Sequence, residues 1–193
     1  MARNREFDTE KVLNKAVELF WNRGYNGVST QELIEEFGIS KSSLYAAFGD
    51  KMQLFITALE RYRQQVADDT AKRLQYCTDT RKEIKKIFTD IAQKASVDKV
   101  SKGCLVVNSC IELAPYNSEI AGIVRDHRKK LETIFANAIR RGIEKNEIPR
   151  GKDPQSLSRV LCTAINGIQV DARYLKDKKY FDDVIRSVLE ILD

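Results

Sequence analysis

Apolar residues recur at intervals of three and four along almost the whole chain, and this spacing constrains the fold more than any other sequence feature. It is the period of an α-helix that buries one face. No stretch shows the alternation of apolar and polar residues that a half-buried strand requires. We therefore predict an all-α protein of about nine helices. The apolar stripes lie at 12–20, 33–37, 44–48, 54–66, 84–95, 104–114, 120–139, 157–168 and 181–192.

Polar residues that cap helices stand in front of several of these stripes. Ser29 and Thr80 are each followed three residues later by glutamate, the capping-box pattern in which side chain and backbone bond reciprocally. Asp153 precedes a proline, which is favoured at the first position of a helix. The expected N-caps are Ser29, Ser40, Asp50, Thr80 and Asp153.

Three short helices occupy the N-terminal quarter of the chain. The first ends at Gly24, the second runs to Gly38, and the third spans 41–48. Only the turn Gly38-Ile39 and the capping residue Ser40 separate the second helix from the third. This arrangement predicts a helix-turn-helix unit.

The start of the third helix carries groups suited to DNA. In a helix-turn-helix, the second helix of the pair enters the major groove with its N-terminal residues toward the base edges. Here small hydroxyl residues allow close approach, Lys41 adds a positive charge, and free backbone N–H groups face phosphate. Taken alone, a Ser-Lys-Ser-Ser run is more often only a capped and solvated helix start.

The run does not stand alone, because the residues around it resemble the signature of the tetracycline-repressor (TetR/AcrR) family over roughly residues 8–60. The matching residues are Ala16, Leu19, Phe20, Gly24, Tyr25, Val28, Ser29 and Thr30, then Ile39 to Tyr45, Phe48 to Lys51, Leu54 and Phe55. The resemblance implies a homodimeric regulator that joins DNA binding and ligand sensing in one chain. It implies a helix-turn-helix DNA-binding domain at 1–50 and a helical ligand-binding and dimerisation domain at 51–193.

The resemblance also implies roles for particular side chains. Lys41 and Ser43 are expected to face bases. The expected phosphate contacts are Thr30, Ser42, Tyr45 and Lys51. Ala46 and Ala47 stand where the family often has larger polar or aromatic residues, so only apolar contact with a thymine methyl is left there. We expect the basic start of the chain, Arg3 and Arg5, to add an arm in the minor groove.

We therefore predict a repressor that binds a palindromic double-stranded DNA operator and is released by an unidentified small molecule. For the ligand site we expect a pocket among the fourth to eighth helices, because a few polar groups in an apolar wall orient a ligand. The candidates are Cys104, Asn108, Glu112 and His127. The competing interpretations are that Glu112 faces water and that His127 is a satisfied core residue.

A second hypothesis for the switch is a thiol pair, Cys104 and Cys110. Six residues along a helix separate Cα atoms by about 9 Å, whereas a disulfide needs less than about 7 Å. The two cysteines therefore cannot form a disulfide while their helix is intact, and buried structural thiols explain them more simply.

Dimerisation is expected through the apolar faces of the last two helices, whose stripes exceed what a small helical core can cover. Ile165 and Ile185 are the residues expected at this interface.

Charge and motifs narrow the class of protein. The net charge is +5, but residues 1–51 carry seven basic and eight acidic side chains, so local geometry rather than net charge must provide a DNA site. The chain contains no phosphate loop, dinucleotide fingerprint or G-x-S-x-G elbow and only one histidine, so we expect no enzyme activity, cofactor or metal site. A nucleoid-type architectural protein remains the alternative.

The sequence has neither an apolar signal peptide nor a run of about 18 apolar residues. We expect no membrane association and a cytoplasmic location. The four cysteines lack the spacing of a zinc site or a secreted disulfide framework.

Overall fold

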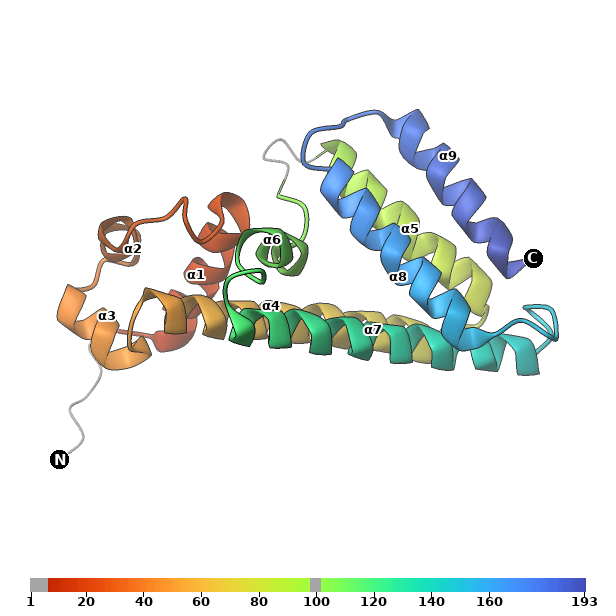
Figure 1. The fold of residues 1–193 in the computed structure, drawn as a ribbon, viewed down its shortest axis with the longest axis horizontal. Helices are drawn as coiled ribbons and strands as arrows, with labels where there is room; N and C mark the ends of the chain where they lie inside the picture. The colour runs from red at the N-terminus through yellow and green to blue at the C-terminus, as the bar shows by residue number, and fades with distance from the viewer. Residues whose placement is uncertain (1–6, 98–101) are drawn as a thin grey trace.

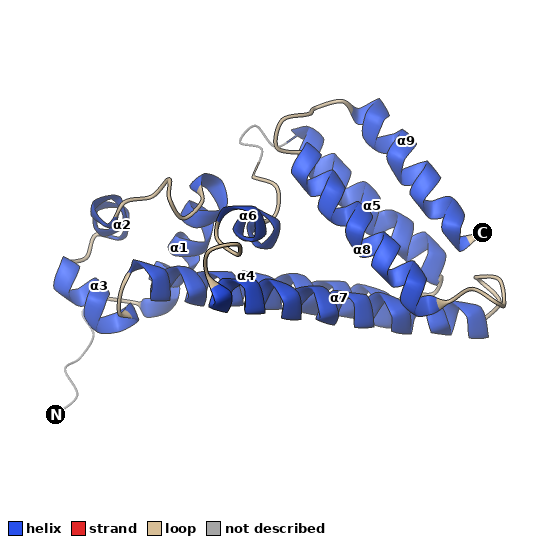
Figure 2. Cartoon of the chain, in the orientation of Figure 1, coloured by secondary structure: helices blue, strands red, loops and turns tan. Residues whose placement is uncertain are grey.

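A computed structural model describes residues 7–97 and 102–193 of the chain, and these ranges form nine α-helices with no strand (Figure 1, Figure 2). The all-α prediction is confirmed. The helices are α1 (Thr9–Arg23), α2 (Thr30–Phe37), α3 (Lys41–Phe48), α4 (Lys51–Gln75), α5 (Thr80–Val97), α6 (Leu105–Glu112), α7 (Ser118–Glu144), α8 (Pro154–Asp171) and α9 (Lys178–Leu189), with a final 3₁₀ turn at Glu190–Leu192. Arg3 and Arg5 lie outside the described residues.

Most of the expected caps are present. Ser29 and Glu32 form both bonds of a capping box at the start of α2, and Asp50 accepts from the backbone N–H of Gln53 at the start of α4. Asp153 caps α8 ahead of Pro154. These ends are set by residues within three positions of the cap, so local sequence specifies them.

The capping box expected at Thr80 is wrong. Asp79 caps α5 instead, accepting at 2.9 Å from the backbone N–H of Lys82. Glu83 bonds to Arg73 of α4, with Nε at 2.6 Å from Oε1. Arg73, on another helix, therefore binds the glutamate that the local pattern predicted for the capping box.

Two hydrophobic clusters hold the chain together. The first combines α1, α2 and α3 with the first half of α4, and it extends to Leu105 and Val106 of α6 and Ile120 of α7. The second joins the end of α4 with α5, α7, α8 and α9. Below, "the head" means α1–α3. Because α4 begins at residue 51 and belongs to both clusters, it connects the head rigidly to the rest.

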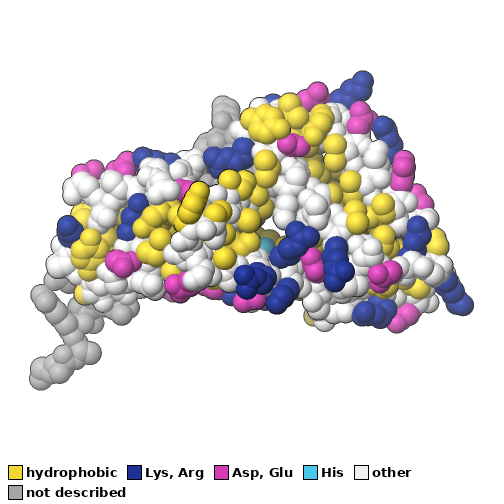
Figure 3. Space-filling view, in the orientation of Figure 1, with side chains coloured by type: hydrophobic (Ala, Val, Ile, Leu, Met, Phe, Trp, Pro, Cys, Tyr) yellow, Lys and Arg dark blue, Asp and Glu magenta, His cyan; other side chains and the backbone are white. Residues whose placement is uncertain are grey.

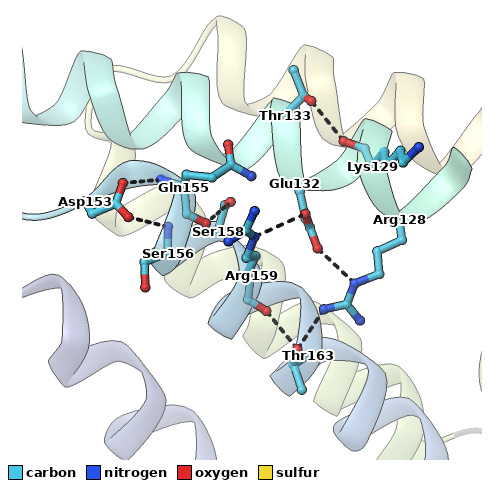
Figure 4. Close-up of polar contacts among 10 residues, drawn as sticks. All are labelled: Arg128, Lys129, Glu132, Thr133, Asp153, Gln155, Ser156, Ser158, Arg159 and Thr163. Carbon is cyan, nitrogen blue, oxygen red and sulfur yellow. Dashed lines mark hydrogen bonds and ion pairs between the residues drawn. The ribbon is translucent and has the colours of Figure 1, made fainter. Parts of the chain in front are cut away.

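α4 and α7 run side by side in the same direction along the molecule (Figure 1). Lys130 of α7 donates to Gln64 of α4, and further along the same two helices Arg141 donates to the carbonyl of Leu74. The other long contact of α7 is with α8. There, Glu132 accepts from Arg128 at 2.8 Å and faces Arg159 at 3.9 Å, while Arg128 also donates to Thr163 (Figure 4).

Ile165 and Ile185 do not lie on the surface of this chain. Their exposed fractions are 7 % and 5 %, and both pack in the second cluster. The expectation that they form a dimer contact needs correction, because the helical period shows which face is apolar but not which neighbour covers it. The exposed apolar residues on or beside α8 and α9 are Val160, Val170, Tyr174 and Tyr180.

None of the helices in the described ranges has the length and apolar character needed to span a membrane.

Candidate DNA-binding interface and ligand site

α3 lies at the end of the molecule farthest from α9 and exposes its first turn (Figure 1). Leu44 is buried at 1 % exposure and fixes the helix against the head, whereas Lys41, Ser42 and Tyr45 are exposed. Because Leu44 faces inward while these three residues are exposed, the outer face of α3 is open to a partner.

The hydroxyl groups at the start of α3 bond to one another. The Ser40 hydroxyl accepts from the backbone N–H of Ser43 at 3.1 Å. It also lies 2.9 Å from the hydroxyls of both Ser42 and Ser43. Each hydroxyl has further lone pairs and a rotatable proton. The cluster can therefore exchange these local bonds for phosphate or base edges without leaving a buried group unsatisfied.

Two lysines near α3 rest on aromatic rings. The Lys41 ammonium lies 5.7 Å from the centre of the Tyr45 ring, and the Lys51 ammonium lies 4.1 Å from that of Tyr25. Burial lowers the pKa of Lys51, an effect that the carboxylates of Glu112 and Glu32 oppose. Both contacts hold the charge near the head surface by cation–π attraction.

The acidic residues of α2 are tied into the head. The Ser29 backbone N–H, followed by the Arg23 guanidinium and the Ser29 hydroxyl, lowers the pKa of Glu32 to about 2. Arg23 lies 2.7 Å from this carboxylate, and the neighbouring Glu35 accepts from Gln31. These pairings occupy part of the negative charge of α2 within the head, while Lys41 and Lys51 carry positive charge at α3 and at the start of α4.

Thr30 is partly buried at the first position of α2, and Lys51 holds the same position in α4. Together with α3, three helix N-termini belong to this end of the chain. The six residues predicted to contact DNA lie within the first five positions of these three helices. Their contact with DNA stays a prediction.

The residues predicted for a ligand site have separate surroundings. Cys104 precedes α6 and is buried; its thiol lies against the Tyr62 hydroxyl, and burial raises its pKa. The Asn108 amide donates to the carbonyl of Lys102 at 3.0 Å. Glu112 faces the head, where it accepts from the backbone N–H groups of Tyr25 and Asn26.

His127 is different, because the structure gives its Nδ1 no hydrogen-bond partner among the described residues. The side chain is only 6 % exposed. Burial, followed by the charges of Arg63 and Lys130, lowers the pKa of the imidazole to about 4. A neutral imidazole with an unpaired nitrogen inside the protein is a free-energy cost that a bound polar group would remove.

The thiols Cys104 and Cys110 lie six positions apart, and α6 spans Leu105–Glu112 as a continuous helix. Cys104 is buried whereas Cys110 is exposed. The spacing argument against a disulfide between them therefore applies to this conformation.

Figure 3 shows hydrophobic side chains gathered over α6 and over α8, with the surface hollowed between them. A separate open hollow of about 790 Å³ lies between α5 and α9, outside the α4–α8 region expected for the ligand. Its lining is strongly charged and includes Arg81, Lys85, Asp182 and Glu190.

Sequence reasoning missed the roles of Tyr25 and of Glu112. Tyr25 belongs to the motif quoted above, but its pattern did not reveal that the ring supports Lys51. The partners of Glu112 lie 87 and 86 residues away, so no local spacing indicates them.

Two family models match the chain. Residues 12–58 match the bacterial regulatory proteins of the tetR family, and residues 81–188 match a tetracyclin repressor-like C-terminal domain. An uncharacterised HTH-type transcriptional regulator of Bacillus subtilis, YezE, is 31 % identical over 100 % of both chains. The HTH-type transcriptional repressor ComR of Escherichia coli is 30 % identical, covering 89 % of this chain and 82 % of the relative.

Solved structures agree with these matches. A cysteine mutant of the TetR family regulator CifR, complexed with a 26-base-pair operator, aligns over 100 % of both chains with a TM-score of 0.86 and 27 % identity. The reduced form of E. coli NemR, at 19 % identity and a TM-score of 0.86, covers 95 % of this chain and 96 % of its own, and shares the fold.

Proposed function

Because the chain belongs to the TetR family of DNA-binding transcriptional regulators, we propose that it represses transcription from a palindromic operator until a small molecule releases it. Dimerisation and ligand response are typical of the family. The observation that carries the proposal is the exposed first turn of α3, with the starts of α2 and α4 belonging to the same head.

The proposed DNA contacts divide into two groups. Lys41 and Ser43 read base edges from the start of α3, where a good side-chain pair discriminates one base from another by about 1–3 kcal/mol. Phosphate contacts position the helix without reading sequence. Those contacts come from Thr30, Ser42, Tyr45 and Lys51.

Two copies of α3 are needed to read the two halves of a palindrome. The proposed dimer forms through α8 and α9, where Val160 (44 % exposed) and Tyr174 (74 % exposed) leave apolar surface uncovered in a single chain. The head lies at one end of the molecule and α8 and α9 lie at the other, with α4 and α7 running between them (Figure 1). In a dimer formed through α8 and α9, the orientation of α4 and α7 would therefore set the distance between the heads of the two chains.

The proposed ligand site lies among α4–α8, near His127. A ligand with a hydrogen-bond donor would satisfy its unpaired Nδ1, if the proton of the neutral ring is on Nε2. We include Cys104, which precedes α6, and Asn108 of α6 in the proposed site, and the Asn108 amide can exchange its bond to the Lys102 carbonyl for one to the ligand. A ligand shifts the protein between states only by its different affinity for them. Glu112, already bonded to the head, is the least suited of the four predicted residues to hold a ligand.

This function requires no catalysis, cofactor or metal, and it places the protein in the cytoplasm with the DNA. The architectural-protein alternative differs in one measurable respect, because such a protein would bind DNA without sequence preference.

The test starts with duplexes enriched from a random-sequence pool by the unaltered dimer. We expect a two-fold symmetric consensus with half-sites about one helical turn, or a multiple, apart, and retention of the complex against excess random DNA. Lys41→Ala and Tyr45→Phe should weaken binding, whereas Lys145→Ala, at the far end of α7, should not. A pool that stays unenriched would contradict the proposal.

A further inference from the structure

The last turn of α6 is joined to the head by one carboxylate. Glu112 Oε2 accepts from the Tyr25 backbone N–H at 3.0 Å, and Oε1 accepts from that of Asn26 at 2.7 Å. Neither oxygen bonds within α6 in this arrangement. Two successive N–H groups that converge on one anion form a backbone nest, here occupied by a side chain of the other domain.

The approach of Glu112 to this turn is close. Gly24 has φ +73°, and a Cβ placed on it would lie 2.7 Å from Glu112 Oε2. The backbone conformation at residue 24 favours glycine, and a side chain there would displace the Glu112 carboxylate from the turn.

The turn held by Glu112 supports a proposed DNA contact. The centres of the Tyr25 and Phe55 rings lie 5.2 Å apart in an edge-to-face arrangement. The Lys51 ammonium lies over the Tyr25 ring, 4.1 Å from its centre. The Glu112 carboxylate also acts on Lys51 electrostatically. A shift of the turn would displace Tyr25 and, with it, Lys51 at the start of α4.

The other end of α6 is fixed to both the head and α8. The Trp21 indole donates to the Gly103 carbonyl at 2.9 Å, and the Lys102 ammonium lies 2.7 Å from the carboxylate of Glu18. On the opposite side, Arg173, just after α8, donates to the Lys102 carbonyl at 3.2 Å. The segment before α6 therefore contacts both the head and the region just after α8, and the last turn of α6 contacts the head a second time.

We infer that Glu112 is a positioning residue for DNA binding, whose carboxylate sets the α1–α2 turn, and with it Lys51, according to the position of α6. The inference rests on the proposed DNA-binding function. Movement of α6 by a ligand would pull or release the turn through these two hydrogen bonds, without any ligand contact at Glu112.

The experiment compares Glu112→Ala and Glu112→Gln with Glu144→Gln, which removes the same charge from an exposed site at the end of α7. Amide hydrogen exchange at Tyr25 and Asn26 is measured first, without DNA. We expect exchange to accelerate about tenfold or more in Glu112→Ala, the size expected for bonds to a charged acceptor, and to stay unchanged in Glu144→Gln.

Affinity for the enriched duplex is measured next. We expect Glu112→Ala to bind about tenfold more weakly, with Glu112→Gln weakened in the same direction because its NH₂ would face one of the two backbone donors. If Glu112 contributed only negative charge near DNA, both variants would bind more tightly. Equal or tighter binding together with unchanged amide exchange would overturn the inference.

Glu112→Asp guards against a folding defect, since it keeps the charge but is too short to reach both amides. Circular dichroism and melting confirm that each variant is folded before binding is compared. If the unaltered protein enriches no duplex, the proposed function fails, and unchanged exchange at the two amides would separately exclude Glu112 as the group that holds the turn.

Discussion

The polar groups at the helix starts of the head and several polar groups of the C-terminal helices find their hydrogen-bond partners over different distances. In the head, Ser40 bonds to Ser42 and Ser43, and Ser29 bonds to Glu32, all within three residues. In the C-terminal part, the backbone N–H of Thr80 donates to Glu147 and Arg141 donates to the Leu74 carbonyl, each across 67 residues.

This difference shows which region depends mainly on local sequence for its structure and which depends on the packing of helices. Local bonds let the head form its helix starts largely from its own sequence, and they leave exposed hydroxyls that can turn to DNA. Bonds across helices make the positions of Thr80 and Arg141 depend on how the C-terminal helices pack. Under the proposed function, a ligand bound between those helices would change the arrangement of several of them together, as a switch requires.

The largest expected effect tests whether one head can bind the operator without the second head of the proposed dimer. Val160→Asp places a charge on the exposed apolar face of α8, and we expect monomers at micromolar concentration by sedimentation. Loss of the second head should lower operator affinity by about a hundredfold or more, since linked sites gain this much.

The matched control is Tyr76→Asp, an exposed aromatic residue (77 %) that directly follows α4 and belongs to neither α8 nor α9. It should remain dimeric. A dimeric Val160→Asp variant with full operator affinity would place the interface on another surface.

A second prediction concerns the buried imidazole. His127 has a pKa of about 4 in the folded protein and about 6.5 when exposed. As pH falls below about 6.5 the unfolded state takes up a proton that the folded state refuses, so the free energy of unfolding should decrease, by up to about 3 kcal/mol near pH 4. Urea unfolding at pH 7, 6, 5 and 4 measures this.

His127→Asn removes the titrating group and should flatten the curve between pH 6.5 and 4 relative to the unaltered chain. Parallel curves for the two proteins would show that His127 is accessible to protons in the folded state.

The third prediction separates two lysines of the DNA face. Lys51→Ala should lower the slope of log affinity against log salt by about one and weaken all duplexes alike. Lys41→Ala should instead relax preference at one base pair, by about 1–3 kcal/mol. Titrations at several salt concentrations, with matched and singly mismatched duplexes, measure both; identical behaviour of the two variants would contradict the division into base and phosphate contacts.

The smallest expected effect tests how local the head is. Ser40→Ala removes the cap of α3 and should reduce the free energy of unfolding by about 1 kcal/mol. Ser42→Ala, which leaves the cap intact, should have almost no effect on stability. Equal losses in urea unfolding would mean that the hydroxyl cluster, rather than the cap, holds the helix start.

The fold and the helix-turn-helix arrangement of the head were predictable from the sequence because short-range signals specify them. Helix periods, the caps at Ser29 and Asp50, and the turn at Gly38 each depend on residues a few positions apart. The cap at Thr80 failed for the opposite reason: Arg73, on another helix, binds the glutamate that would complete it.

The ligand region could not be predicted to the same depth. The apolar stripe around His127 indicated its burial, but nothing in the stripe showed that Nδ1 would lack a partner. The period of α8 likewise placed Ile165 on an apolar face without showing that the same chain already covers it. Both properties are decided by helices distant in sequence.

Trp21 is the only tryptophan of the chain, and it stands where α1 meets the segment before α6. Its ring packs edge-to-face on Tyr62, with centres 5.0 Å apart, and the Lys102 ammonium lies 5.1 Å from the centre of the indole. The intensity and wavelength of indole emission depend on such polar and charged neighbours. The protein therefore carries an intrinsic fluorophore where the head meets α4 and the segment before α6, so changes at that junction can be followed in real time without a label.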